Sequence, residues 1–287
     1  MRPLLIAGPT GAGKSAFALK AAAEGGVVVN ADASQVYAGW RILTARPSAA
    51  DEGLAPHRLY GHVDPARRYS VGDWLRDLAL TLTEAREAGL RPVIVGGTGL
   101  YFAAATQGLA PIPQVPETVR AGVAARLTAE GLAALAHELT ARDPETAATA
   151  DLQNPMRVAR ALEVLEATGR GLASWREETG PPLIGDADRM LILPERGALY
   201  ARLDRRFDAM LAEGVLEEAR AMRARRLNPA LPAMKAVGAP ALFAHLDGEI
   251  GLDEAAERAR RATRNYAKRQ MTWARSRMND WPKAESG

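Results

Sequence analysis

The 287-residue sequence contains no cysteine, and none of its apolar stretches reaches the roughly 18 residues that a membrane-spanning helix needs. Without cysteine, a disulfide framework, a thiolate zinc site, an iron–sulfur cluster and a cysteine nucleophile are all excluded. The first apolar stretch, from Leu4 to Ala7, is too short for the core of a signal peptide. We therefore expect a cytoplasmic protein that makes no membrane contact.

Histidine is also scarce, and the four histidines are too scattered to form a helical metal site of the H-E-x-x-H type. The rest of the composition, 47% hydrophobic and 25% charged, is ordinary for a globular chain. A chain of this length can bury a full core and suits about two domains.

Positive charge is concentrated in one part of the sequence. The net charge is only +3, yet residues 220–287 contain 14 Lys or Arg against 7 Asp or Glu. Such an excess indicates either a surface that binds a polyanion or a solvated helix face. Six of these basic residues have a spacing that covers one broad helix face. They are Arg258, Arg260, Arg261, Arg264, Lys268 and Arg269.

Short apolar runs alternate with helical patterns in the first part of the chain. The runs are continuous rather than alternating, as in strands that are covered on both faces. Helical patterns at residues 14–24 and 71–88 separate the first three runs. This order predicts an α/β fold with a parallel sheet. The four runs cover residues 3–7, 27–29, 92–95 and 190–193.

The middle of the chain has a different texture. Three prolines interrupt residues 111–116, and only helical patterns follow, at 118–129, 132–141 and 154–168. The last of these starts with Asn154 and Pro155, a cap residue and a proline at the first helical position.

Two further long helices are expected at 197–213 and 252–278. We therefore expect a discontinuous core, residues 1–110 plus 189–287, with an all-helical domain inserted at residues 111–188.

A phosphate-binding motif follows the first predicted strand. Residues 8–15 match G-x-x-x-x-G-K-[ST], the P-loop of nucleotide-binding proteins, between a predicted strand and a predicted helix. The loop glycines let successive N–H groups face phosphate oxygens, and the helix start adds its positive dipole end. Lys14 would meet the terminal phosphate, and the Ser15 hydroxyl is a magnesium ligand. The predicted phosphate-binding residues are Gly8, Pro9, Thr10, Gly11, Ala12, Gly13, Lys14 and Ser15.

Two further polar residues follow predicted strands, at the sheet edge where ligands of open α/β sheets bind. Asp32, three residues after Val29, fits a magnesium ligand, a general base or a turn-capping aspartate. Thr98 lies in the turn Gly96-Gly97-Thr98-Gly99 and fits either a donor to phosphate or the cap of the next helix.

Seven segments, in order along nearly the whole chain, resemble the tRNA dimethylallyltransferase family, also called the isopentenyl-diphosphate:tRNA isopentenyltransferases. A P-loop alone is common to many families, whereas this combination is specific. The most distinctive segments are Gly8–Ser15, NADASQVY at 30–37 and VGGTGLY at 95–101. The others are TARP at 44–47, APHRL at 55–59, RALEV at 160–164 and AKRQMTW at 267–273.

The resemblance implies transfer of the dimethylallyl group from dimethylallyl diphosphate to N6 of the tRNA adenosine just 3′ of the anticodon, position 37, with release of diphosphate. It implies a P-loop NTPase or kinase-like core whose helical insert grips the anticodon stem-loop. Mg²⁺ is the expected cofactor, and we expect the chain to act as a monomer.

The resemblance also assigns residues. Asp32 aligns with an aspartate that contacts the adenine amino group and is proposed as general base, while Thr98 and Arg120 align near the reacting phosphates and the tRNA. The catalytic set is Asp32, Thr98, Lys14 and Arg120. The tRNA-contacting set comprises Asp32, Ala33, Ser34, Gln35, Thr98, Arg120, Met156, Arg157, Val158, Ala159, Arg160, Lys235, Ala236, Val237 and Gly238.

The sequence departs from the family pattern at a few positions. Ala33 replaces a common Ser, with Ser34 following it. Ala239 and Pro240 replace an aromatic and a basic residue. Arg41, Leu43 and Arg46 stand where Asp, Gly and Lys are common.

Three other functions use the same motifs. A prenyltransferase acting on free adenine nucleotides would be a closer relative, but such enzymes tend to be compact, so the helical insert argues against it. A P-loop kinase for a small metabolite would take ATP as donor and Asp32 as base, but it needs neither the helical insert nor the basic C-terminal region. A non-catalytic nucleotide-binding module would need no carboxylate beside the P-loop, so replacing Asp32 would leave its activity unchanged.

Overall fold

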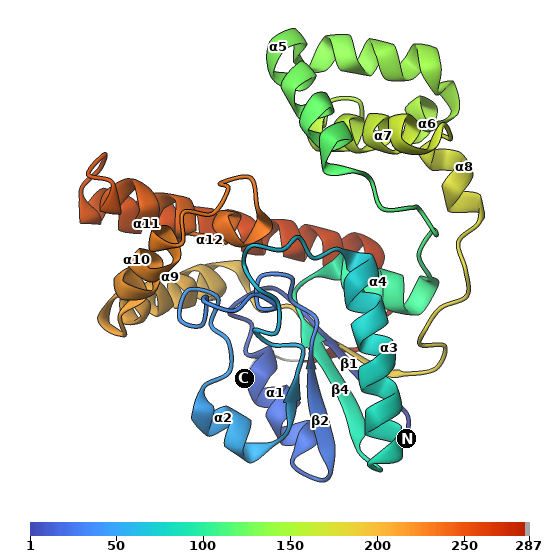
Figure 1. The fold of residues 1–287 in the computed structure, drawn as a ribbon. Coiled ribbons are helices and arrows are strands. Elements are labelled where there is room, and N and C mark those ends of the chain that lie inside the picture. The colour runs from blue at the N-terminus through green and yellow to red at the C-terminus, as the bar shows by residue number, and fades with distance from the viewer. Residues whose placement is uncertain (285–287) are drawn as a thin grey trace. The chain divides into compact units, whose positions relative to one another are not determined.

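The computed structural model describes residues 1–284, which include a six-stranded parallel sheet (Figure 1). The strand order is β3-β2-β4-β1-β5-β6. This arrangement confirms the parallel α/β fold predicted from the apolar runs. The strands are β1 (Leu4–Ala7), β2 (Gly26–Asn30), β3 (His57–Arg58), β4 (Arg91–Gly96), β5 (Asp188–Ile192) and β6 (Lys283–Ala284).

Helices cover both faces of the sheet, which explains why the strands are apolar without alternation. Leu5 packs in one layer and Ile6 in the other, because successive side chains of a strand point to opposite faces. The layer around Leu5 contains Trp74 of α3 (Val71–Glu87), Phe102 of α4 (Gly99–Gln107) and the end of α12 (Leu252–Arg277). The layer around Ile6 contains α1 (Lys14–Ala22).

Further helices gather at the end of the sheet where the strands finish. In Figure 1, α9 (Arg196–Ala212) and α12 run across the ends of β1, β2 and β4. Together with α10 (Val215–Ala224), the short 3-10 helix Pro232–Lys235 and α11 (Ala239–Leu246), they form two more apolar clusters. The loops that leave the strands therefore emerge beneath α9 and α12.

Residues Gln107–Pro182 form a compact helical unit of their own, separate from the unit made of Met1–Thr106 and Leu183–Gly287. Its helices are α5 (Glu117–Arg142), α6 (Pro144–Thr149), α7 (Pro155–Thr168) and α8 (Leu172–Glu177).

Two details of this helical unit were expected from the sequence. Gly131, with φ of 83°, divides α5 into two helical segments, as predicted. Asn154 caps α7 by accepting hydrogen bonds from the N–H groups of Met156 and Arg157, which confirms its assignment as the cap.

The elements that sequence reasoning did not identify are short. They are α2 (Ala49–Leu54), β3, α6, α8, α10, the 3-10 helix Pro232–Lys235, α11 and β6. The two strands have two residues each and lie at the edges of the sheet, so they leave no apolar run to recognise. Within residues 1–284, no helix combines the length and the apolar character that crossing a membrane requires.

Candidate active site

The P-loop connects the end of β1 to the start of α1. Gly13 stands just before α1 with φ of 84°, a conformation that favours glycine. The Lys14 ammonium donates to the carbonyl oxygen of Pro9 at 2.8 Å, so the side chain folds back over its own loop. The pKa of Lys14 is lowered from 10.5 to about 8, mainly by burial; Asp32 opposes the shift and Arg206 adds to it.

Two arginines of α9 add positive charge beside the P-loop. Arg206 Nη2 donates to Thr10 Oγ1 at 2.9 Å, and Arg202 Nη1 donates to the carbonyl oxygen of Gly11 at 3.2 Å. Burial lowers the pKa of Arg206, although its guanidinium stays charged. Sequence reasoning missed both residues. Their four-residue spacing in the helix predicted at 197–213 was the available signal.

Asp32 lies in a turn in which both its backbone and its carboxylate make hydrogen bonds. The buried Asn30 side chain accepts from the Asp32 N–H at 2.8 Å and donates to the Asp32 carbonyl at 3.0 Å. Asp32 Oδ1 accepts from the Ser34 N–H at 3.0 Å and from Ser34 Oγ at 2.6 Å. Only 8% of Asp32 is exposed. These contacts fix one carboxylate oxygen of Asp32, a residue that lines both cavities described below.

Thr98 joins the loop after β4 to the Asp32 turn. Thr98 Oγ1 accepts from the Ala33 N–H at 2.9 Å, and the Thr98 N–H donates to the carbonyl oxygen of Ala31 at 3.1 Å. The Thr98 side chain also has a hydrogen bond with the Tyr266 hydroxyl, which lowers the pKa of Tyr266 against the effect of Asp32. Both residues that flank Asp32 are thus tied to Thr98.

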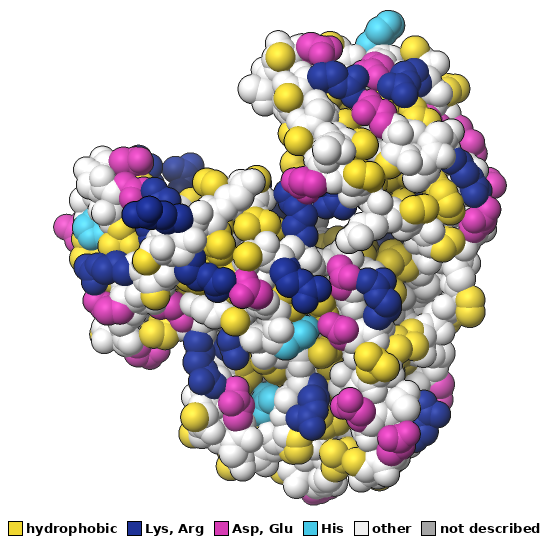
Figure 2. All heavy atoms as spheres, in the orientation of Figure 1, with side chains coloured by type: hydrophobic (Ala, Val, Ile, Leu, Met, Phe, Trp, Pro, Cys, Tyr) yellow, Lys and Arg dark blue, Asp and Glu magenta, His cyan; other side chains and the backbone are white. Residues whose placement is uncertain are grey.

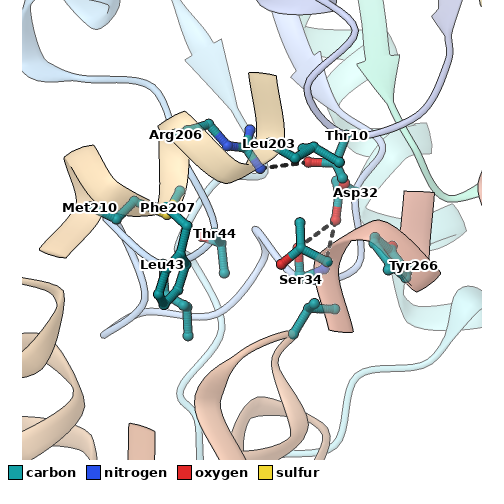
Figure 3. Close-up of a pocket in the computed structure, with 12 residues that line it drawn as sticks. Thr10, Asp32, Ser34, Leu43, Thr44, Leu203, Arg206, Phe207, Met210 and Tyr266 are labelled. Carbon is teal, nitrogen blue, oxygen red and sulfur yellow. Dashed lines mark hydrogen bonds between the residues drawn. The ribbon is translucent and has the colours of Figure 1, made fainter. Parts of the chain in front are cut away.

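Two cavities meet at these residues. One is lined by the P-loop residues Thr10–Ser15 together with Asp32, Gln35 and Arg206. The other, drawn in Figure 3, is lined by polar Thr10, Asp32 and Ser34 and by apolar side chains of α9. Thr10, Asp32 and Arg206 line both cavities. A ligand whose phosphates occupy the first cavity would therefore have its other end beside Asp32. The apolar side chains of the second cavity include Leu43, Leu203, Phe207, Met210 and Val237.

The charge of Asp32 is felt by the groups around this pocket. It is the main cause that raises the pKa of Tyr266, an α12 residue lining the cavity in Figure 3, and burial adds to the effect. Burial is the main cause that raises the pKa of Tyr60, and the charge of Asp32 adds to it. A phenol beside a carboxylate stays protonated, so both tyrosines remain neutral donors at neutral pH.

The remaining predicted residues fall into two groups. Lys235, Ala236, Val237 and Gly238 belong to the same unit as the P-loop, and Val237 lines the pocket. Arg120 and residues 156–160 belong to the helical unit.

Within residues 156–160, Val158 and Ala159 are buried in the core of the helical unit. Met156 is 74% exposed, Arg157 lies 3.7 Å from Asp151, and Arg160 lies 3.5 Å from Glu163. Side-chain contacts of this segment with a ligand therefore fall to Met156, Arg157 and Arg160.

The basic face expected on the last long helix is partly neutralised. Arg258 pairs with Glu254 at 2.6 Å, and Arg264 pairs with Asp204 of α9 at 2.7 Å. Arg260 pairs with Asp208, so three of the six predicted positions carry a carboxylate partner. Figure 2 shows the same mixture, with basic and acidic side chains interspersed over the visible face. The prediction considered only the basic residues of this helix and not the acidic side chains that α9 places beside them.

Nearly the whole chain is similar to known proteins. A family model described as IPP transferase matches residues 35–277. A tRNA dimethylallyltransferase of Cereibacter sphaeroides (strain ATCC 17029) is 58% identical, covering 98% of this chain and 88% of the relative. One of Bradyrhizobium sp. (strain BTAi1) is 54% identical, covering 98% and 93%.

Solved structures of tRNA-modifying transferases are also similar to this chain. A full-length tRNA isopentenylpyrophosphate transferase from Bacillus halodurans is 32% identical with a TM-score of 0.70, covering 99% of this chain and 90% of that one. A eukaryotic dimethylallyltransferase acting on tRNA shares the fold, with a TM-score of 0.83 at 24% identity over 99% and 73%. The family and the P-loop NTPase-like core inferred from the sequence motifs are confirmed. The chain belongs to the IPP transferase family, that of its tRNA dimethylallyltransferase relatives.

Proposed function

We propose that this chain transfers the dimethylallyl group of dimethylallyl diphosphate to N6 of the adenosine 3′-adjacent to the tRNA anticodon, position 37, and releases diphosphate. The observation that carries the proposal is the meeting of a P-loop cavity and a second pocket at Asp32. Membership of the IPP transferase family supports it independently.

The P-loop cavity suits the leaving diphosphate. An allylic diphosphate ionises toward a delocalised cation, so negative charge develops on the departing phosphate oxygens. Lys14, Arg206 and the first N–H groups of α1 surround the place where that charge would form. Burial makes these charges more effective than they would be in water. Residues 8–15 thus stabilise the leaving group.

Asp32 suits the acceptor side. The amino group of adenine is a weak nucleophile because its lone pair is delocalised into the ring. A carboxylate within hydrogen-bond reach would accept the proton as the new C–N bond forms and the C–O bond to diphosphate breaks. Ser34 and Asn30 hold Asp32 in place for this role. Of the three assignments open from the sequence, we propose the general base.

The donor set fits a divalent cation that enters with its substrate. Within residues 1–284, no group of three or more His, Asp or Glu side chains could hold a metal ion by itself. Ser15 is exposed and lines the P-loop cavity, as does Asp32. Magnesium usually takes one or two protein oxygens, several waters and substrate phosphates. We propose that Ser15 contributes that oxygen for Mg²⁺, which would neutralise developing diphosphate charge.

The tRNA anticodon stem-loop is the proposed partner of the helical unit and of residues 235–238. Arg120, Arg157, Arg160 and Lys235 would contact phosphates, whereas Ser34 and Gln35 would contact the target base. The base must leave its stack to reach a buried pocket, at a cost of a few kcal/mol. We further propose that the chain acts in the cytoplasm as a monomer.

The experiment is nucleoside mass spectrometry of unmodified tRNA incubated with the protein, dimethylallyl diphosphate and Mg²⁺. We expect a dimethylallyl mass gain on the adenosine next to the anticodon. The isosteric variant Asp32→Asn should lower kcat by about 10²- to 10⁴-fold, since it removes the proton acceptor.

A competent tRNA that gains no mass would contradict the transferase function, and measurable ATP turnover would then favour the kinase. A fully active Asp32→Asn variant would remove Asp32 as the base while leaving the transferase function intact.

A further inference from the structure

One side chain of α12 bonds to both loops that build the site. Gln270 is 8% exposed and points from α12 toward the ends of β1 and β4. Its Oε1 accepts from the Thr10 N–H in the P-loop at 2.8 Å. Its Nε2 donates to the carbonyl oxygen of Gly97, in the turn after β4, at 2.9 Å. Gln270 thus bridges the two loops that begin where the pairing of β1 with β4 ends, at Ala7 and Gly96.

The bridge continues to the general base. Gly97 precedes Thr98, and Thr98 bonds to the residues on either side of Asp32, at 2.9 Å and 3.1 Å. The path from the P-loop to Asp32 therefore runs through Gln270, the Gly97–Thr98 peptide and the Ala31–Ala33 backbone. Apart from Gln270 and the Thr98 hydroxyl, every contact in this path is made by backbone atoms.

The contact between α12 and the turn leaves no room for a side chain on either of two glycines of the turn. A Cβ atom on Gly97 would lie 2.2 Å from Gln270 Nε2, and one on Gly99 would lie 2.1 Å from the Trp273 ring. Gln270 and Trp273 are one helical turn apart on α12, so the helix presses on the turn at two points. Such packing holds the turn in one position.

We propose that Gln270 is a positioning residue of the transfer reaction, which sets the separation between the P-loop and Asp32. The inference rests on the proposed function, because the P-loop then binds the leaving diphosphate and Asp32 orients the attacking amine. Gln270 need not touch either substrate. A misplacement of about 1 Å between reacting groups can cost about a hundredfold in rate. Loss of the bridge should therefore lower kcat more than it weakens binding.

The first test is Gln270→Met, which keeps the length of the side chain and removes both hydrogen bonds. We expect kcat to fall by about tenfold to a hundredfold, with the KM for dimethylallyl diphosphate changed by less than about threefold. Thr272→Ala, an exposed position on the same helix, is the matched control and should keep both constants. Wild-type kcat per folded molecule in Gln270→Met would overturn the proposal.

A second variant covers the case in which Gln270→Met does not fold. Gln270→Glu retains an acceptor for Thr10 and loses the donor for Gly97. Its added charge would act on the donor KM, whereas loss of the Gly97 bond would act on kcat, so the two effects are separable. An unchanged kcat in this variant would equally overturn the proposal.

Amide hydrogen exchange tests the bridge without turnover. In Gln270→Met, the Ala33 N–H should exchange faster together with the Thr10 N–H, whereas Thr272→Ala should change neither. If wild-type protein made no modified tRNA, the proposed function would fail while faster exchange at Ala33 still supported the bridge. Faster exchange at Thr10 alone would overturn the link to Asp32.

Discussion

The two units of the chain bury polar side chains for different purposes. In the P-loop unit, Asn30, Asp32 and Gln270 are buried around the loops that end the strands, and each bonds to the backbone of a loop. In the helical unit, the buried Asp143 accepts from the Thr146 N–H at 3.1 Å, and Thr146 accepts from the Ala173 N–H at 2.9 Å. The first bond caps α6, and the second joins α6 to α8.

Burial of a polar group is unfavourable unless hydrogen bonds compensate it, so both sets need a reason. Within residues 1–284, Thr81 is the other polar residue that is exposed as little as these, and its hydroxyl bonds to its own helix. The comparison teaches that buried polarity in the first unit shapes a ligand site, whereas in the second it stabilises the fold. Changes in the first unit should therefore alter kinetics, and changes in the second should alter stability.

The largest effect that tests this comparison is expected at Arg206. Arg206→Met removes a cation from the P-loop cavity and should raise the KM for dimethylallyl diphosphate by about tenfold to a hundredfold, because a buried charge–phosphate contact is lost. Steady-state kinetics with saturating tRNA would measure it.

The control is Arg205→Met, which makes the same charge change at an exposed position of α9 and should keep the donor KM. Equal shifts in the two variants would mean that overall charge, and not the pocket, controls donor binding.

The next effect is a pH dependence of donor binding. The pKa of Lys14 is about 8 in the folded chain, so the ammonium is present below pH 8 and is lost above it. Donor affinity should then fall by up to about tenfold per pH unit above pH 8, because binding of the diphosphate then requires Lys14 to take up a proton. Binding measured between pH 7 and pH 9.5 would reveal the slope, and Lys14→Met should flatten it.

Folding linkage gives the opposite sign. The unfolded chain keeps Lys14 protonated up to about pH 10.5, so between pH 8 and pH 10.5 the unfolded state binds more protons than the folded state. The contribution of Lys14 to the free energy of unfolding therefore rises with pH in this window. Donor binding that strengthened over the same window would contradict the assigned role.

The smallest effect lies in the helical unit. Asp143→Ala removes the cap of α6 and should lower the free energy of unfolding by about 1 kcal/mol, while kcat per folded molecule stays unchanged. Urea unfolding followed by circular dichroism would measure the loss. Glu145→Ala, at an exposed position in the first turn of α6, is the control and should cost less than Asp143→Ala, because it removes only a carboxylate near the helix N-terminus. A fall in kcat per folded molecule in Asp143→Ala would contradict the distinction between the two units.

Local sequence signals predicted the parts of the molecule that depend on neighbouring residues. The P-loop, the buried strands and the Asn154 cap each occupy one short segment, so a motif or a spacing was enough to identify them. The position of Asp32 after a strand could likewise be recognised, because parallel strands end at one edge of the sheet.

Contacts between distant segments were not predictable in this way. Arg206 and Gln270 bond to Thr10 across 196 and 260 residues, and nothing in their local patterns indicates that target. The pairing of Arg264 with Asp204 was missed for the same reason, since each helix was considered alone. The residues assigned through the family resemblance alone, such as Arg120, stay predictions.

The bridge between Thr10 and Gln270 has a consequence for synthesis on the ribosome. The P-loop leaves the ribosome early, but its partner in α12 is made 260 residues later. At about 5–20 residues per second, that interval is on the order of tens of seconds. During this time Thr10 and the turn after β4 lack the side chain that joins them. A nascent chain that has not yet reached Gln270 therefore carries the P-loop without its bridge to the turn after β4.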